Sequence, residues 1–370
     1  MKRERIRILY FILLPPPVHG VSIINRLVYD SPLINENIDR ELLEIRFSDK
    51  LTQLRKWRPG KILKFIRLIW LLAIKMKRRK PDYIYFSIMA VGKGFVRDLF
   101  FVLIMKIFGV KTIFHIHNRG IKRHSGFALM SCIYRFVFNN SMVIHLSDRL
   151  METEINELNP RNCTRMVIPN GLPSVVPEPE QVKTDGTIRL LFLSNLFAGK
   201  GLEDLMHVFF NLTERYSNLE LIVAGAFPTT REEKRINKLI ACNERAGKVK
   251  LIGPVYGEKK QSIYHTSDIF VFPTFFSQEC FPLVILEAMQ TGLPVVATKE
   301  GAIPEIITDG VTGFLIDARD TESLRKKLSL LIESPELRNK LGENARQLFE
   351  GKYTSEHFEK RMRAFYDTYL

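Results

Sequence analysis

Three consecutive segments decide the fold of this chain: DIFVFP at residues 268–273, ECFPLVILEAM at 279–289 and GLPVVAT at 292–298. The first and third are short apolar runs bounded by turn residues, which are typical of buried strands. The middle segment has Pro282 at the expected first position of a helix, where proline is favoured. This order of strand, helix and strand predicts a parallel α/β unit.

Two carboxylates bracket the start of this predicted helix. Glu279 falls in the loop beyond the carboxyl end of a strand, where open α/β sheets bind ligands. Helix amides and the helix dipole favour an anion at the same place. A nucleotide sugar offers hydroxyls for carboxylates and a diphosphate for helix ends. Taken alone, Glu279 or Glu287 is better explained as an ordinary surface or helix residue, so the prediction depends on the whole run.

The run resembles the signature of the retaining glycosyltransferases of family 4: Glu, seven residues, Glu, Ala-Met and a Gly-x-Pro-Val-x-Ala strand. The resemblance implies that Glu279 lies beside the hydroxyls of the donor sugar, as a catalytic residue, and that Glu287 holds the ribose diol. It also places Phe281, Pro282 and Leu283 at the donor. The family usually has Phe-Gly where this chain has Phe281-Pro282, and proline removes a backbone donor that could face the diphosphate.

Length and composition predict a globular protein of two domains, because 370 residues and 46% hydrophobic content are sufficient for two cores. Four cysteines have no C-x-x-C spacing, which argues against zinc and disulfides and fits a reducing compartment. No signal-peptide layout and no apolar run of roughly 18 to 20 residues is found. We therefore expect a cytoplasmic protein, peripheral at the inner face of the cell membrane.

Each half alternates short apolar runs with longer helical patterns, which predicts an α/β fold of two Rossmann-like domains. By resemblance this is the GT-B architecture, with the domains facing each other across a cleft. The expected domains are 1–176 on the acceptor side, a proline-rich linker 177–186, the donor-binding domain 187–353, and a helix 354–370 returning to the first domain. We interpret 309–315 mainly as a structural turn. The predicted strands are 6–14, 83–87, 112–117, 142–146, 166–169, 188–193, 219–224, 249–252, 268–273 and 294–298.

A second donor-binding segment is the turn 194–201, which follows the predicted strand 188–193 and precedes a helix. Its glycines allow close backbone approach, and Lys200 can neutralise a diphosphate. The family places an arginine five residues before this lysine, whereas this chain has the uncharged Asn195, so Lys200 carries more of the electrostatic role. By resemblance, the loop that contains Gly253 and Val255 meets the nucleobase.

The first half carries a third candidate site. PPPVHG at 15–20 ends the first strand without the G-x-G-x-x-G pattern, which argues against a nicotinamide enzyme. By resemblance the turn that contains Gly20 faces the cleft between donor and acceptor, which makes Gly20 a candidate donor-binding residue, while His19 could be a ligand contact or an ordinary loop residue. His115 and His117 lie on one face of a strand that is ending; no third metal ligand has a recognisable spacing. We interpret them as a hydrogen-bonded structural pair. The resemblance implies that His117 touches the transferred sugar as a catalytic residue and that His115 supports it.

The net charge of +15 is concentrated in the first half, where 1–180 has 30 Lys and Arg against 15 Asp and Glu, while 181–370 has 25 of each. Within 61–80, cations occupy about one third of the helical circumference and the rest is apolar. This predicts a crossover helix with a solvated basic face, a membrane-surface helix, or both. The cations of this basic arc are Lys61, Lys64, Arg67, Lys75, Arg78 and Arg79.

Together these patterns predict a hexosyltransferase that uses a UDP- or GDP-linked sugar and a membrane-held glycan acceptor, in lipopolysaccharide or surface polysaccharide synthesis. The expected partners are the nucleotide sugar, a lipid-linked or polysaccharide acceptor and an anionic membrane surface. No D-x-D motif accompanies the diphosphate loop, so no obligatory metal and no cofactor is expected. The alternatives are a nucleotide-sugar epimerase or phosphorylase, or a basic nucleic-acid-binding protein. No nucleic-acid motif is recognised, which argues against the last.

Overall fold

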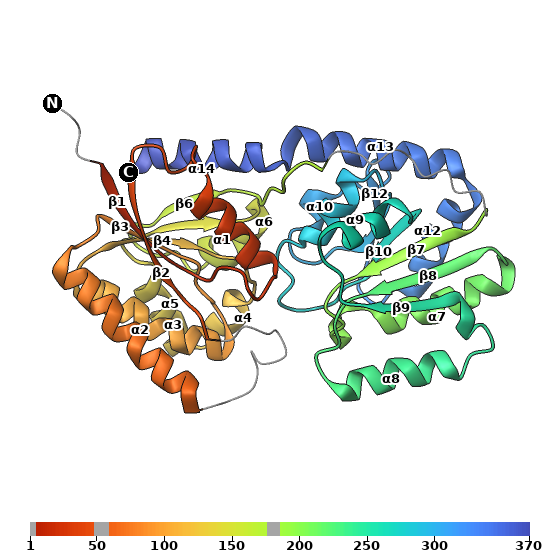
Figure 1. The fold of residues 1–370 in the computed structure, drawn as a ribbon, viewed down its shortest axis with the longest axis horizontal. Helices are drawn as coiled ribbons and strands as arrows, with labels where there is room; N and C mark the ends of the chain where they lie inside the picture. Colours follow the sequence, from red (N-terminus) through yellow and green to blue (C-terminus); the bar gives the residue numbers. More distant parts are fainter. Residues whose placement is uncertain (1–4, 48–58, 176–185) are drawn as a thin grey trace. The chain divides into compact units, whose positions relative to one another are not determined.

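The computed structural model describes residues 5–47, 59–175 and 186–370 (Figure 1). The chain divides into two compact units. The first runs to Gly171 and includes Ser355–Leu370, and the second is Leu172–Thr354. The predicted linker 177–186 lies outside the described residues, except for Gly186.

The first unit is built on a parallel sheet with the strand order β2-β1-β3-β4-β5-β6. Strand β1 lies inside the sheet and is buried from residue 8 to residue 12, which explains the continuous apolar sequence of that part. Leu9 and Phe11 enter one core, while Tyr10 between them points to the other face. The strands are β1 (Ile6–Ile12), β2 (Ile38–Glu44), β3 (Tyr83–Phe86), β4 (Lys111–His115), β5 (Met142–His145) and β6 (Thr164–Val167).

Helices α2, α3 and α5 cover one face of this sheet (Figure 1). They contribute Leu72, Phe101 and Tyr134 to the core that contains Leu9 and Phe11. The helical segments of the unit are α1 (Gly20–Asp30), α2 (Pro59–Arg78), α3 (Gly92–Ile107), α4 (Ile121–Ser125), α5 (Ala128–Phe138), α6 (Asp148–Leu150), the π-helix η2 (Met151–Asn156) and α14 (Ser355–Tyr369).

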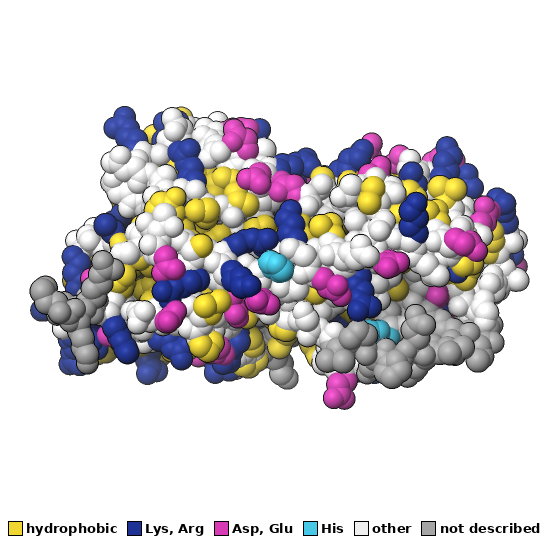
Figure 2. Space-filling view, turned by 90° about the horizontal axis from the view of Figure 1, so that it is seen from above, with side chains coloured by type: hydrophobic (Ala, Val, Ile, Leu, Met, Phe, Trp, Pro, Cys, Tyr) yellow, Lys and Arg dark blue, Asp and Glu magenta, His cyan; other side chains and the backbone are white. Residues whose placement is uncertain are grey.

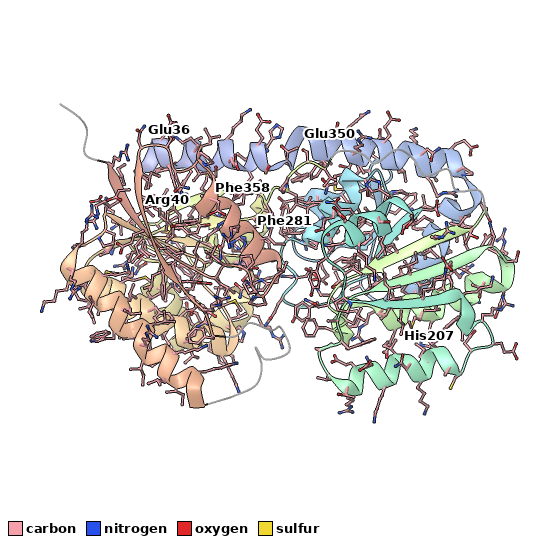
Figure 3. All side chains as sticks on the ribbon, viewed as in Figure 1. Glu36, Arg40, His207, Phe281, Glu350 and Phe358 are labelled. Carbon is pink, nitrogen blue, oxygen red and sulfur yellow. The ribbon has the colours of Figure 1, made fainter. Side chains whose placement is uncertain are left out.

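The C-terminal helix α14 packs on the first unit, although it follows the second unit in the sequence. The hydroxyls of Tyr10 and Tyr366 are 3.3 Å apart, and Arg363 donates to the backbone oxygen of Glu36 at 2.9 Å. Phe358, labelled in Figure 3, is fully buried and stacks on the ring of His115, with centroids 6.5 Å apart. These contacts join α14 to β1 and β4.

The second unit has a parallel sheet with the order β12-β11-β10-β7-β8-β9. Helices α7 and α12 bury Phe209 and Leu328 in one core. The strands are β7 (Ile188–Leu193), β8 (Leu219–Ala224), β9 (Val249–Gly253), β10 (Ile269–Phe272), β11 (Val295–Thr298) and β12 (Gly313–Ile316). The helical segments are η3 (Ala198–Lys200), α7 (Leu202–Arg215), α8 (Thr230–Ala241), η4 (Ala246–Lys248), α9 (Gly257–His265), α10 (Leu283–Gln290), α11 (Ile303–Ile306), α12 (Thr321–Glu333) and α13 (Pro335–Lys352).

The prediction of two Rossmann-like α/β domains is confirmed, but two strands were missed. Strand β2 is an edge strand and mostly only half buried, so its sequence IDRELLE lacks a continuous apolar run. Strand β12 lies largely within 309–315, which we interpreted mainly as a structural turn. That interpretation is wrong for Gly313–Ile316, which pairs with β11. Its four residues are too few to separate it from the turn before it.

The strand orders define where a ligand can bind to each unit. In the second unit the chain proceeds from β7 outward to β8 and β9, and then returns to add β10 on the other side of β7. The strand order therefore reverses between β7 and β10, and open α/β sheets bind ligands at such a switch point, beyond the carboxyl ends of the strands. In the first unit the corresponding position lies between β1 and β3. Within the described residues, no helix combines the length and apolar character needed to cross a bilayer.

Candidate functional site

The structure brings Lys200 and Glu279 together at the switch point of the second sheet. Lys200 follows β7, Glu279 follows β10, and the Lys200 ammonium donates to Glu279 Oε2 at 2.5 Å. The two side chains are only 12% and 8% exposed, so this ion pair is largely shielded from water. The expectation that Glu279 lies in the loop beyond a strand agrees with its position between β10 and α10.

The two loops approach so closely because of one glycine. Gly201 has φ +80°, and a Cβ on it would lie 2.0 Å from the carbonyl oxygen of Pro273. Phe275 donates its backbone N–H to Gly199 at 2.7 Å, which fixes the contact from the other side. Any side chain at position 201 would separate the loops and, with them, Lys200 from Glu279.

Aromatic rings and a threonine hold the pair in place. The Lys200 ammonium lies 4.9 Å from the ring centroid of Phe276 and 5.3 Å from that of Phe272, within the range of cation–π attraction. The hydroxyl of Thr274 donates to Glu279 Oε2 at 3.2 Å. Thr298, at the end of β11, in turn donates to the backbone oxygen of Thr274.

The unused acceptor of Glu279 gives the site its chemistry. The bonds from Lys200 and Thr274 both end on Oε2. Within the part of the chain that the structure describes, no hydrogen bond ends on Oε1 of Glu279. This atom is therefore free to accept a hydrogen bond from a ligand hydroxyl. The ammonium of Lys200 has three donors, of which Glu279 takes one. An anion and a hydroxyl group could thus be bound side by side.

Glu287 lies on α10 and is held by two residues of α9. Lys260 pairs with Oε1 at 2.5 Å, and the hydroxyl of Tyr264 donates to Oε2 at 2.9 Å. Burial, together with the charge of Glu287, raises the pKa of Tyr264 well above its ordinary value, so the phenol keeps its proton and donates. A carboxylate has about four lone-pair sites. The bonds from Lys260 and Tyr264 therefore leave about two lone-pair sites of Glu287 unused.

The other expected donor residues lie on several elements of the second unit. Gly253 ends β9, and Val255 is buried just before α9, the helix that carries Lys260. Asn195 is exposed in the loop after β7. Leu283 is buried and begins α10.

The residues before α10 differ from expectation at one position. Pro282 does not occupy the first helical position, because its ψ of 110° is extended and makes it the N-cap, so the helix begins one residue later. The ring of Phe281, labelled in Figure 3, is buried and lies edge-on to Tyr353 at 6.1 Å. The ring of Phe281 is therefore shielded from solvent.

In the first unit, His117 belongs to a group of buried histidines rather than to a pair. The rings of His115 and His117 are 4.0 Å apart, and His145 lies at the end of the neighbouring strand β5. The Nε2 atoms of all three are buried and have no hydrogen-bond partner within the described residues. The interpretation of a fully hydrogen-bonded structural pair is therefore wrong for these atoms.

Burial keeps these imidazoles uncharged. It lowers the pKa of His117 to about 3, with smaller contributions from His145 and His19, and it lowers that of His145 to about 3. Burial and the neighbouring His117 and His145 hold the pKa of His115 well below its ordinary value. At neutral pH the group offers nitrogen donors and acceptors without positive charge.

The structure gives His19 a local role. It is the N-cap of α1, where its Nδ1 accepts from the N–H of Ser22 at 3.4 Å and its own N–H donates to the hydroxyl of Ser22 at 3.1 Å. Burial lowers the pKa of His19 to about 4, which keeps Nδ1 an acceptor. Gly20 is exposed as the first residue of α1. Across the described ranges, no group of three His, Cys, Asp or Glu residues could hold a metal ion.

The two six-stranded parallel sheets and their interleaved helices define the GT-B architecture of glycosyltransferases. The fold matches sucrose-phosphate synthase from Thermosynechococcus elongatus with a TM-score of 0.78 at 16% identity, over 98% of this chain and 99% of that one. HepE from Anabaena, solved with UDP-glucose, matches with a TM-score of 0.72 at 18% identity over 98% and 99% of the two chains. At these identities the matches show the fold alone.

Residues 178–348 match the family described as Glycosyl transferases group 1. The chain is 26% identical over 181 residues to the capsular polysaccharide biosynthesis glycosyltransferase CapM of Staphylococcus aureus, covering 48% of this chain and 46% of that protein. It is 28% identical over 195 residues to the lipopolysaccharide 1,2-N-acetylglucosaminetransferase of Salmonella typhimurium, covering 50% of each. The chain thus spans about half the length of these relatives. The family match and the GT-B fold support a glycosyltransferase.

Sequence reasoning missed four residues of the site: Lys260 and Tyr264 beside Glu287, and Thr274 and Thr298 beside Glu279. Lys260 and Tyr264 are four residues apart, so they share one face of a helix. That spacing was a usable signal, but nothing local connects it to a glutamate 27 residues farther along the chain. Contacts of this kind are set by the packing of α9 on α10.

Proposed function

We propose that the protein is a retaining hexosyltransferase that moves a sugar from a nucleoside diphosphate to a hydroxyl of a membrane-held glycan. The nucleotide of the donor is UDP in preference to GDP. The observation that carries the proposal is the shielded Lys200–Glu279 pair at the switch point of the second sheet. A cation and a carboxylate oxygen with spare hydrogen-bonding capacity suit the diphosphate and the sugar hydroxyls of one donor.

In this proposal each site residue has its own role in donor binding or sugar transfer. Lys200 binds the diphosphate and stabilises the charge that develops on it as the sugar leaves. Glu279 accepts from the sugar hydroxyls, and Glu287 accepts from the ribose diol with its remaining lone pairs. The departing diphosphate takes the proton of the acceptor hydroxyl on the same face of the sugar, which gives retention. His117 and Gly20, in the first unit, contact the transferred sugar.

The choice of donor and acceptor is supported by relatives. HepE from Anabaena binds UDP-glucose, which favours a UDP-linked donor. The matched proteins of Staphylococcus aureus and Salmonella typhimurium are named for capsular polysaccharide and lipopolysaccharide, which favours a glycan acceptor at the inner face of the cell membrane. We propose that the reaction needs no divalent cation, because Lys200 supplies positive charge at the diphosphate.

The proposal is tested first by donor binding. Thermal unfolding is followed with UDP, GDP, ADP and their sugars, because a ligand at 100 times its dissociation constant stabilises a protein by about 2.7 kcal/mol. Stabilisation by UDP and a UDP-sugar is expected. No stabilisation by any nucleotide would remove the donor site from the second unit.

The second test is the reaction itself. A lipid-linked glycan is incubated with the stabilising UDP-sugar in the presence of EDTA. We expect release of UDP only when acceptor is added, and an unchanged anomeric configuration by NMR. Conversion of the sugar without acceptor would indicate an epimerase. A product of inverted anomeric configuration would refute retention. Loss of activity in EDTA would refute metal independence.

A further inference from the structure

Helix α2 exposes apolar side chains in the first unit. Leu63, Ile66 and Trp70 recur at i, i+3 and i+7, which places them on one stripe of the helix. Leu63 and Trp70 are 72% and 64% exposed. The opposite side of the helix buries other residues, Leu68 and Leu72, in the core. The exposed stripe is therefore additional to the apolar face that folding requires.

Helices α3 and α5 repeat this pattern. On α3, exposed apolar residues recur at i, i+4, i+7 and i+11, and on α5 two are seven residues apart. Among the described residues, 11 of the 18 exposed large hydrophobic side chains belong to these three helices and the N-cap of α5. They form what we term the apolar face: Ile62, Leu63, Ile66, Trp70, Val96, Phe100, Leu103, Ile107, Phe127, Leu129 and Phe136.

The apolar face is continuous across the three helices. The rings of Phe65 on α2 and Phe100 on α3 meet edge to face, with centroids 5.7 Å apart. Between α3 and α5 lies an open hollow of about 350 Å³, lined by Leu99, Phe100, Leu103, Cys132, Ile133 and Phe136. A monomeric protein rarely exposes so large an apolar surface unless something covers it.

The chain segment that carries the apolar face is strongly cationic. Residues 59–138, which include all three helices, contain 16 Lys and Arg but only two acidic residues, Asp82 and Asp98. Asp98 is buried and paired with Arg97 at 2.6 Å, and Asp82 accepts from the backbone N–H of Arg7 at 2.8 Å. By contrast, Figure 2, seen from the side on which α13 and α14 lie in Figure 1, shows cationic and anionic side chains interspersed.

The basic arc, which continues from α2 to Arg79, is partly neutralised by ion pairs within the first unit. Lys75 pairs with Glu41, and Arg79 pairs with Asp39 at 2.8 Å, both on β2. Lys64 and Arg67 are exposed close to the apolar stripe. The structure therefore favours a contact in which apolar side chains are buried and cations surround them, over one made by the basic arc alone.

We propose that the apolar face of α2, α3 and α5 inserts into the boundary between headgroups and acyl chains of an anionic bilayer. Trp, Phe, Leu and Ile beside Lys and Arg are the residues that such interfacial helices use. A second copy of the chain fits less well, because a symmetric contact would bring two strongly cationic segments together. This inference stands independently of the proposed transfer reaction, since it concerns residues outside the donor site.

The first experiment measures flotation with vesicles of phosphatidylcholine, with and without phosphatidylglycerol, at low salt and at 1 M salt. At 1 M the Debye length is only about 3 Å, so purely electrostatic docking is lost. We expect anionic vesicles to bind the protein and to retain a substantial fraction at 1 M. Replacing Leu63, Ile66 and Trp70 with Ser should weaken that salt-resistant binding by about tenfold or more.

A matched control replaces exposed apolar residues of the second unit, Val311 and Leu330, with Ser; they are 48% and 47% exposed. This variant should float like the unmodified protein. UDP binding should be unchanged in both variants, which separates failure of membrane insertion from failure of the proposed donor site. Equal melting temperatures verify that both variants fold.

The second experiment reads insertion directly. The sequence has two tryptophans, and Trp57 lies outside the described residues, so Trp57→Phe leaves Trp70 as the sole emitter. Anionic vesicles should shift Trp70 emission to the blue, and brominated acyl chains should quench it. Unchanged emission, flotation that disappears at 1 M salt, or no flotation would overturn the proposal. A dimer with shielded Trp70 in the absence of lipid would overturn it in favour of self-association.

Discussion

Lys200→Ala is expected to destabilise the second unit by leaving the carboxylate of Glu279 without its cation. Removing one partner of a buried ion pair costs about 3–5 kcal/mol. The pair is 12% and 8% exposed, and Thr274 still donates to Glu279, so we expect the lower end, about 3 kcal/mol. At 2–4 °C for each kcal/mol in a domain of this size, the melting temperature should fall by about 6–12 °C.

A set of variants separates charge from packing in calorimetric unfolding. The double variant Lys200→Met with Glu279→Gln removes both charges and should recover most of the lost stability. An exposed pair provides the control: Arg346 and Glu350 are 45% and 55% exposed at 2.9 Å, so Arg346→Ala should shift the melting temperature little. If Lys200→Ala melts like the wild type, or the double variant is as unstable as the single one, the pair is not coupled as the structure indicates.

The same variants test the two ends of the donor. Lys200→Ala should lose most of the stabilisation by UDP, because Lys200 supplies the cation at the diphosphate. Glu279→Gln should keep that stabilisation, since it frees Lys200 from its partner, but should impair turnover. The opposite result for the two variants would mean that the diphosphate and the sugar occupy each other's positions.

Three further predictions concern the remaining site residues. Glu287→Ala should weaken UDP binding by about 1.5–3 kcal/mol, roughly ten- to a hundredfold in calorimetric titration, and unchanged affinity in a folded variant would remove Glu287 from the site. Tyr264→Phe removes the donor to Glu287 Oε2 and should weaken UDP binding about tenfold, whereas the exposed Tyr256→Phe should not; equal effects would argue against positioning by Tyr264. Lowering the pH from 6.5 to 5 should destabilise the first unit, because histidines with pKa values near 3 when folded and about 6.5 when unfolded bind protons only in the unfolded chain. The free energy of unfolding should fall by about 2 kcal/mol for each of His117 and His145. It can be measured by urea unfolding monitored by tryptophan fluorescence. An unfolding free energy that does not change over this pH range would contradict the neutral histidine group.

Much of the second unit could be predicted because its pattern is local. In 268–298 the apolar runs and the turn residues are adjacent in the sequence, so the order of strand, helix and strand can be read without tertiary contacts. Strand β2 could not be found in this way. Its position at the edge of the sheet leaves most of its side chains half exposed, and a half-exposed strand has no continuous apolar run.

The α2 segment shows where a periodic pattern becomes ambiguous. Its sequence defined a basic arc, but apolar residues occupy the rest of the circumference. Which of them face the core depends on the position of α2 over the sheet. The structure buries Leu68 and Leu72 and leaves Leu63 and Trp70 exposed. Periodicity alone could not distinguish these two sets, because both are apolar and both recur at helical spacing.

Sequence patterns were thus sufficient for the fold class, the switch-point loops and the choice of Lys200, Glu279 and Glu287 as candidates. Only the tertiary structure decided which residues these three contact. Lys200 and Glu279 are 79 positions apart, and they meet because β10 pairs beside β7. The physical reason is that local patterns report which side chains a strand or helix buries, whereas an ion pair depends on where the sheet brings two distant loops together.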